Sequence, residues 1–290
     1  MLGAMDRSPS SDTVAVVGLG TMGRKIAELC LANGFHVIGA SRTIESGRKA
    51  YEKLSLDLTR KAEKGKITPE AKNAMLSRIR LAENLSDLAE ASIVIEAVNE
   101  DLQVKKDVYR KVEAHIPSST LLATNTSSLS VTELGNELAH PQRFVGLHFF
   151  NPPDVMRLVE VRKGGKTSIG VTEASTEFAR RLGRTPIIVP DIPGYYVNRL
   201  LFPMLIESML VLDSDNTNPK DVDDAMKLGA NHPMGPLELC DFIGNDVVLR
   251  ICEILYERIH DPRFEPPSIL VEMVSQGKLG RKTGEGFYKY

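Results

Sequence analysis

The chain has 290 residues, of which 42% are hydrophobic and 26% charged, so it holds enough apolar side chains for a sizeable core and is not dominated by disorder. Its formal charge of −2, from 36 basic and 38 acidic residues, provides no basic field for a phosphate backbone, and nucleic acid is not an expected partner. The length favours two domains.

The cysteines and the apolar runs restrict the class of protein further. Cys30, Cys240 and Cys252 are an odd number at wide spacings with no CxxC pair, which argues against a disulfide framework and a zinc site. No run approaches the roughly 20 apolar residues of a membrane helix. Residues 1–11 are short and polar, and we expect a loose tail there rather than a secretory signal. We therefore expect a cytoplasmic protein with no membrane partner and no metal.

Strand and helix patterns alternate along the first two thirds of the chain. Such alternation predicts βαβ units and a mostly parallel sheet that is covered by helices on both faces. The predicted strands are 13–18, 36–41, 92–97, 120–124, 144–150, 155–161 and 187–189, and the predicted helices are 22–32, 46–65, 102–115 and one that begins at Thr68-Pro69.

The pattern changes at the Pro- and Gly-rich segment 190–194, and everything after it has helical spacing. We predict an α/β domain over 12–190 and an all-α domain over 191–290. Within the second domain, the expected helices are 196–212, 220–228, 237–256 and 267–276.

A glycine-rich loop follows the first predicted strand. Gly18, Gly20 and Gly23, with Thr21 and Met22 between them, form a G-x-G-x-x-G pattern that opens a predicted helix. In this context the pattern indicates a Rossmann-type dinucleotide site, in which the pyrophosphate lies against the helix N-terminus. The alternative is an ordinary strand–helix turn.

The end of the second strand departs from an NAD site. An acid is expected there to bind the ribose hydroxyls, but the chain has Ser41 and Arg42 instead. A hydroxyl and a guanidinium suit a 2′-phosphate, so we expect NADP(H) to be tolerated or favoured alongside NAD(H). The alternative is a solvated arginine on a surface turn.

One histidine and one glutamate fall on neighbouring strands. His148 ends a strand, a proline-containing turn follows, and Glu160 lies on the next strand with Met156 and Leu158 on its face. A carboxylate in apolar surroundings needs a partner, and the turn can return it beside His148. Such a pair suits general acid/base catalysis, although a structural pair in the core is the alternative.

Polar residues follow other strands at the carboxyl edge of the sheet, where ligands bind in such folds. The small polar run 124–128 can bind a carbonyl or a nicotinamide amide, or it can cap the next helix. Glu96 and Glu100 flank the end of another strand, and Asn198 opens the helical domain.

Taken together, seven stretches resemble the L-3-hydroxyacyl-CoA dehydrogenase family, of the bacterial 3-hydroxybutyryl-CoA dehydrogenase type, from about residue 13 to residue 290. They are GLGTMG, IEAVNE, TNTSSLS, GLHFFNPPDVMRLVEV, PGYYVNR, NHPMGPLELCDFIG and GKLGRKTGEGFYKY.

The resemblance implies a role for each matching residue. His148 would be the general base, oriented by Glu160, and Ser127 and Asn198 would bind the oxygen functions of an acyl-CoA substrate. The cofactor would lie against Gly18, Gly20, Thr21, Met22, Gly23, Asn125, Glu100 and Lys105, and Lys61 and Lys64 are the candidates for coenzyme A. The family also implies a homodimer through the helical domain.

The expected reaction is reversible hydride transfer between NAD(P) and a short 3-hydroxyacyl-CoA. Two alternatives remain open. One is a related dehydrogenase of a small free hydroxy acid or sugar acid, and the other is a nucleotide-binding protein that has lost catalysis.

Overall fold

The computed structural model describes residues 12–214 and 217–290, and the tail expected over residues 1–11 lies outside this part. The chain divides between Asp191 and Ile192 into two compact units. We call residues 12–191 the sheet unit and the described residues from Ile192 onward the helical unit. No helix in the described ranges is long and apolar enough to cross a membrane.

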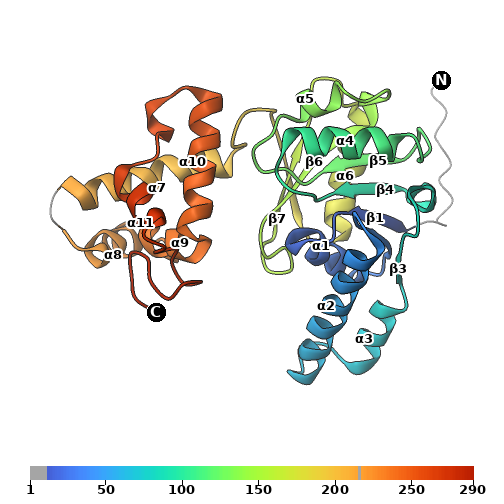
Figure 1. Ribbon diagram of the computed structural model, residues 1–290, viewed down its shortest axis with the longest axis horizontal. Helices are drawn as coiled ribbons and strands as arrows, with labels where there is room; N and C mark the ends of the chain where they lie inside the picture. Colours follow the sequence, from blue (N-terminus) through green and yellow to red (C-terminus); the bar gives the residue numbers. More distant parts are fainter. Residues whose placement is uncertain (1–11, 215–216) are drawn as a thin grey trace. The chain divides into compact units, whose positions relative to one another are not determined.

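The sheet of this unit is drawn in Figure 1. Its eight strands have the order β3-β2-β1-β4-β5-β6-β7-β8. All neighbours run parallel except β6 and β7, which are antiparallel. The strands therefore form the doubly wound, mostly parallel sheet that the sequence predicts. Their bounds are β1 Thr13–Val17, β2 His36–Ala40, β3 Ile79–Leu81, β4 Ile93–Glu96, β5 Leu121–Thr124, β6 Phe144–Phe149, β7 Leu158–Arg162 and β8 Thr185–Val189.

Helices cover both faces of this sheet. Successive side chains of a strand point to opposite faces, and on β1 both sets are apolar and pack against helices. On β1, Val14 and Val16 pack with α1, α2 and α6, whereas Ala15 and Val17 pack in a second core with α4 and α5. Both cores consist of apolar side chains that are removed from water, which is the main stabilisation of such a fold. The helix bounds are α1 Thr21–Ala32, α2 Ile44–Glu63, α3 Pro69–Leu76, α4 Leu102–Glu113, α5 Val131–Gly135 and α6 Ile169–Arg181.

The helical unit packs five helices around a core that includes Phe202, Leu205 and Leu255. The sequence predicts one helix over 237–256, and this prediction is wrong. Gly244 has φ +102°, a conformation that interrupts a helix and favours glycine, so two helices form on either side of it. The bounds are α7 Val197–Ser214, α8 Pro219–Gly229, α9 Pro236–Ile243, α10 Asn245–Ile259 and α11 Ser268–Ser275.

Three further elements of the sheet unit differ from the sequence prediction. The short strand β3 and the helix α6 were not predicted. The strand expected over 155–161 begins only at Leu158, because the N–H groups of Val155 and Met156 both donate to the Pro152 carbonyl in a turn. Met156 is 41% exposed, so its assignment to a buried face beside Glu160 is wrong.

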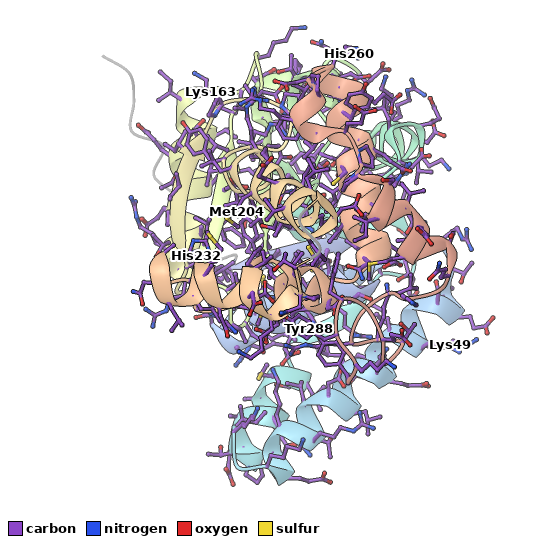
Figure 2. All side chains as sticks on the ribbon, turned by 90° about the vertical axis from the view of Figure 1, so that its left-hand side faces the viewer. Lys49, Lys163, Met204, His232, His260 and Tyr288 are labelled. Carbon is purple, nitrogen blue, oxygen red and sulfur yellow. The ribbon has the colours of Figure 1, made fainter. Side chains whose placement is uncertain are left out.

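Two buried carboxylates bind the last residues of the helical unit. Asp241 accepts the N–H groups of Phe287 and Tyr288, and Asp223 accepts the Tyr288 hydroxyl at 2.7 Å. Tyr288 is labelled in Figure 2. A Cβ on Gly286 would lie 1.9 Å from the Asp241 carboxylate, so only glycine allows this approach. The C-terminal segment is therefore part of the packed unit.

Candidate active site

The carboxyl ends of β1, β4, β5 and β6 lie at one edge of the sheet, because these four strands are parallel. This edge is where ligands bind in open α/β sheets. Most of the residues that the sequence singles out in the sheet unit follow one of these strand ends.

The glycine loop between β1 and α1 has the geometry of a pyrophosphate cradle. A Cβ on Gly23 would lie 1.8 Å from the Gly18 carbonyl oxygen, so helix and loop can approach this closely only with glycine. Gly20, by contrast, has no atom within 4 Å of its Cβ position. The first turn of α1, from Thr21 and Met22 onward, contains no acidic residue. The open side at Gly20 and the free helix N-terminus therefore fit a dinucleotide phosphate.

Ser41 and Arg42 follow β2 directly beside this loop, since the Gly18 N–H donates to the Ala40 carbonyl at 2.8 Å. Ser41 is half-buried and Arg42 is exposed. Within residues 12–214 and 217–290 the Arg42 guanidinium has no carboxylate partner. Thr43 and Ser46 then form a capping box that starts α2. A hydroxyl, a guanidinium and a helix N-terminus thus occur together at the end of β2.

His148 and Glu160 are direct cross-strand neighbours in the antiparallel pair of β6 and β7. His148 Nδ1 lies 2.7 Å from Glu160 Oε2, and the two residues are 7% and 1% exposed. An ionised carboxylate only accepts hydrogen bonds, so Nδ1 carries the proton and the tautomer is fixed. The ring of Phe150 contacts the imidazole, with the two ring centroids 4.4 Å apart. This is the arrangement that a general base requires.

The polar loop after β5 is more fully engaged within the chain than the sequence suggests. The Asn125 side-chain oxygen accepts the Phe149 N–H at 2.9 Å and so supports the end of β6, next to His148. Glu100 Oε1 accepts the Thr126 hydroxyl and, at 2.9 Å each, the N–H groups of Ser127 and Ser128. Thr126 and Ser128 are buried, whereas the Ser127 side chain is half-buried. Ser127 is therefore the serine of this loop that can reach a ligand.

Glu100 contacts this loop directly, and Lys105 pairs with Glu100. Burial raises the pKa of Glu100, but the ammonium of Lys105 and the hydroxyl and N–H donors of the loop outweigh it and lower this pKa. Lys105 has no exposed surface, and its Nζ lies 2.6 Å from Glu96 and 3.5 Å from Glu100. Lys105 is therefore linked to the polar loop through Glu100.

The structure also shows two groups that sequence reasoning missed. Tyr109 lies one helical turn after Lys105 and donates to Glu96, which its i, i+4 spacing from Lys105 on a buried helix face could have indicated. Asp191, at the end of the sheet unit, pairs with buried Arg162 and accepts the Val131 and Thr132 N–H groups. No sequence signal identifies this second contact, because it joins three distant segments.

The two lysines proposed for coenzyme A differ in their surroundings. Lys61 Nζ lies 2.6 Å from Glu28 and 2.8 Å from Asp154, so its charge is already compensated. Burial lowers the pKa of Lys61, but the hydrogen bonds that its ammonium donates to Asp154 and Glu28 outweigh this effect and raise the pKa. Lys64 is exposed at the end of α2. Of the two, Lys64 is the more available to a phosphate.

Asn198 belongs to the helical unit, where it lies in the first turn of α7 and is 9% exposed.

Among residues 12–214 and 217–290, the other histidines, cysteines and acidic side chains form no metal site. All six histidines lie in the described ranges, and only His148 is buried; His232 and His260 lie in the helical unit (Figure 2). Burial raises the pKa of the Cys30 thiol to about 12, so this thiol is not a nucleophile near neutral pH. In the described part of the chain, no three His, Cys, Asp or Glu side chains are placed to hold a metal ion.

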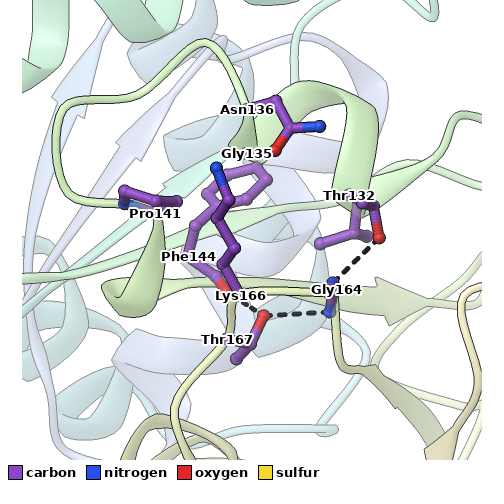
Figure 3. A pocket seen from close by; sticks show the side chains of 10 residues that line it. Thr132, Gly135, Asn136, Pro141, Phe144, Gly164, Lys166 and Thr167 are labelled. Atoms are coloured by element: carbon purple, nitrogen blue, oxygen red, sulfur yellow. Dashed lines mark hydrogen bonds between the residues drawn. The ribbon is translucent and has the colours of Figure 1, made fainter.

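A small notch lies at the opposite end of β6 from His148, between α5 and the segment after β7 (Figure 3). The Gly165 N–H donates to the Thr132 hydroxyl at 2.9 Å, and the Thr167 hydroxyl donates to the Phe144 carbonyl at 2.6 Å. The notch encloses about 10 Å³, room for at most one water molecule. It is a packing feature and does not compete with the sheet edge as a site.

Comparisons with known proteins agree along the whole described chain. The family models described as "3-hydroxyacyl-CoA dehydrogenase, NAD binding domain" and "3-hydroxyacyl-CoA dehydrogenase, C-terminal domain" match residues 13–192 and 194–290. A probable 3-hydroxybutyryl-CoA dehydrogenase of Deinococcus radiodurans is 41% identical over 95% of this chain and 99% of that protein. A 3-hydroxybutyryl-CoA dehydrogenase of Bradyrhizobium diazoefficiens is 41% identical over 96% of this chain and 94% of its own length. The crystal structure of the (S)-3-hydroxybutyryl-CoA dehydrogenase of Ralstonia eutropha has a TM-score of 0.91 and 40% identity, covering 97% of this chain and 99% of that one. The chain therefore belongs to the 3-hydroxyacyl-CoA dehydrogenase family.

Proposed function

We propose that this protein catalyses reversible NAD(P)-dependent hydride transfer between L-3-hydroxyacyl-CoA and 3-ketoacyl-CoA. The short pair 3-hydroxybutyryl-CoA and acetoacetyl-CoA is its expected substrate, as the names of the relatives suggest. The observation that carries the proposal is the buried His148–Glu160 pair, at 2.7 Å, on the ligand-binding edge of a dinucleotide-binding sheet. Such a pair supplies the proton transfer that alcohol oxidation needs.

In the oxidation direction, His148 takes the hydroxyl proton on Nε2 while the C3–H bond breaks and the carbon–oxygen double bond forms. A nicotinamide dinucleotide held at the glycine loop of Gly18, Gly20 and Gly23 would supply the hydride acceptor for this direction and the hydride donor for the reverse. Glu160 holds the Nδ1 proton and stabilises the positive charge that develops on the imidazole ring. In the reduction direction, the imidazolium gives the proton back to the new alkoxide.

Substrate oxygens need donors in addition to the base. Ser127 is suited to this, because Glu100 fixes its N–H, while its half-buried hydroxyl makes a long contact of 3.4 Å with Glu100 that a substrate oxygen can replace. We assign the second polar contact to Asn198 and a contact with a coenzyme A phosphate to Lys64, with Lys61 held in place by Glu28 and Asp154. These assignments follow the family resemblance.

The first experiment measures initial rates of NADH and NADPH oxidation with acetoacetyl-CoA, followed at the absorbance of the reduced nicotinamide. Acetoacetate as the free acid is the matched control substrate. Turnover of the thioester with little turnover of the free acid supports the proposal. Turnover of the free acid alone would favour the dehydrogenase of small hydroxy acids. Binding of either nucleotide with no turnover of any substrate would favour a catalytically silent protein.

We also propose that the enzyme accepts NADP(H), on the basis of Ser41 and the carboxylate-free Arg42 in the described part of the chain. A charge-assisted hydrogen bond is worth about 1.5–3 kcal/mol, so Arg42→Leu should raise KM for NADPH by roughly 10- to 150-fold and leave KM for NADH nearly unchanged. Ser41→Asp should shift the preference toward NADH. Equal effects of Arg42→Leu on both nucleotides would remove this assignment.

A homodimer through the helical unit is the expected assembly. Several large apolar side chains of this unit are exposed in the single chain, including Leu200 at 76%, Leu228 at 86% and Phe242 at 52%. A hollow of about 530 Å³ lies beside Leu200 and Tyr196. Exposed apolar surface of this kind is typical of an interface. The cytoplasmic location expected from the sequence remains a prediction.

A further inference from the structure

Glu96 is the last residue of β4, in the middle of the sheet, and it is only 1% exposed. Its carboxylate is surrounded by donors. Oε1 accepts the Val98 N–H and the Lys105 ammonium, both at 2.6 Å. Oε2 accepts the Tyr109 hydroxyl and, at 2.9 Å, the Thr124 hydroxyl. The four donors come from the β4 end, α4 and β5, so one buried charge joins three elements at the ligand-binding edge.

Lys105 connects Glu96 to Glu100 and, through Glu100, to the polar loop. Its Nζ lies 2.6 Å from Glu96 and 3.5 Å from Glu100, so the fully buried ammonium is held between two carboxylates, closer to Glu96. Glu100 in turn gathers the N–H groups of Ser127 and Ser128 at 2.9 Å each. A shift of the Lys105 ammonium would therefore move Glu100 and, with it, the loop whose N–H groups Glu100 accepts.

A second connection runs from Glu96 to the histidine strand. The Glu96 carbonyl accepts the Asn125 N–H at 2.8 Å, and the Asn125 side chain accepts the N–H of Phe149, the residue after His148. Glu96 is thus linked to Ser127 through its carboxylate, Lys105 and Glu100, and to the strand of His148 through its backbone carbonyl and Asn125. It contacts neither Ser127 nor His148 directly.

Buried charged networks are expensive. Burial of each ion costs several kcal/mol, and apolar residues of similar shape often serve stability equally well. The network of Glu96, Glu100 and Lys105 at the ligand-binding edge is therefore better explained by how it positions the loop at Ser127 than by a contribution to stability. We propose that Glu96 is a positioning residue for the reaction, which fixes Glu100 and Ser127 through Lys105. This inference rests on the proposed function.

The expected effect follows from the distances. In Glu96→Gln, the ammonium loses one of its two carboxylates and is drawn toward Glu100. Closing the 3.5 Å separation to a charge-assisted distance of about 2.8 Å displaces the pair by about 0.7 Å. Misplacement by about 1 Å can cost roughly 100-fold in rate, so we expect kcat to fall about 10- to 100-fold.

The test compares Glu96→Gln with Glu113→Gln. Glu113 also forms an ion pair, with the buried Arg143 at 3.1 Å, but it is itself half-buried and lies at the other end of α4. Both variants are assayed for kcat and KM with acetoacetyl-CoA and for thermal unfolding. Amide hydrogen exchange of the segment 125–130 is measured in parallel without substrate. Tyr109→Phe, which removes one hydroxyl, serves if Glu96→Gln does not fold.

We expect Glu96→Gln to lower kcat as stated and to speed exchange of the loop about tenfold, with Tyr109→Phe giving the same changes at a smaller size. Glu113→Gln should lower the unfolding temperature and leave both quantities within twofold. Unchanged loop exchange in Glu96→Gln and Tyr109→Phe overturns the proposal, whether or not kcat falls. Failure of the wild-type protein to turn over acetoacetyl-CoA would refute the proposed function, and the exchange measurement would still decide the role of Glu96.

Discussion

Replacing Glu160 by glutamine tests the pair at the centre of the proposed reaction. Glutamine keeps the shape of the side chain but removes the charge that lies 2.7 Å from His148 Nδ1. A hydrogen bond to a charged group contributes about 1.5–3 kcal/mol, and this contribution is largest when the imidazole becomes positive during proton transfer. Since each 1.36 kcal/mol is a factor of ten in rate, kcat should fall about 10- to 150-fold.

The assay is the initial rate of NADH oxidation with saturating acetoacetyl-CoA, beside His148→Gln and the control Glu113→Gln. His148→Gln should lose roughly 10²–10⁴-fold, because the proton donor itself is gone. KM for NADH should change little in either variant, since neither residue lies at the glycine loop. A Glu160→Gln enzyme with kcat within twofold of the wild type would refute the reasoning, because the carboxylate would then have no part in proton transfer.

The remaining predictions concern the glycine loop, the end of the sheet unit and the assembly. Gly23→Ala forces a methyl group to 1.8 Å from the Gly18 carbonyl and should destabilise the fold by about 3 kcal/mol or more, as seen in thermal unfolding. Gly20→Ala meets open space, so the variant should fold normally but bind NADH more weakly in a fluorescence titration; normal binding would place the phosphates elsewhere. Burial raises the pKa of Asp191, but Arg162 and the donors of α5 outweigh it and hold this pKa below its usual range. Its stabilisation is therefore present above about pH 4 and is lost as the pH falls through the lowered value. The unfolding temperature of Asp191→Asn should thus lie below that of the wild type at pH 7, and the gap should narrow as the pH falls below about 4. A gap that stays constant would contradict the linkage. Leu228→Asp places a charge on an apolar position that is 86% exposed in the single chain. If Leu228 lies in the proposed dimer interface, the mass measured by light scattering should shift from dimer to monomer. An unchanged dimer would show that Leu228 lies outside the interface.

The local patterns of the sequence predict most of the sheet, because a buried parallel strand is a short β-branched run and leaves a clear signal. The pairing of His148 with Glu160 is also predictable, since a short turn that prolines keep from being helical returns one strand beside the other. The prediction of a single helix over 237–256 fails, because one backbone angle, φ of Gly244, decides where a helix ends. Gly244 resembles any glycine in a helical pattern, and only its positive φ divides the expected helix in two.

The inner side of the site could not be predicted for a different reason. Glu96, Lys105 and Thr124 look like ordinary polar residues at strand and helix ends, and nothing in their spacing states that they face one another. Their contacts depend on how the parallel strands β4 and β5 are aligned in the sheet and on how α4 packs against them, which is a property of the whole fold. The same applies to Lys61, whose partners Glu28 and Asp154 lie 33 and 93 residues away.

The reversed strand β7 has a consequence for how the site assembles during folding. His148 and Glu160 are only 12 residues apart, so their hairpin closes a short loop at a small entropic cost. The network around Glu96 joins residues up to 28 positions apart, and the parallel neighbours of β4 bring together segments that are farther apart still. Contacts at short sequence separation form faster than distant ones, so the His148–Glu160 contact is expected to form before the carboxyl edge of the parallel strands is complete.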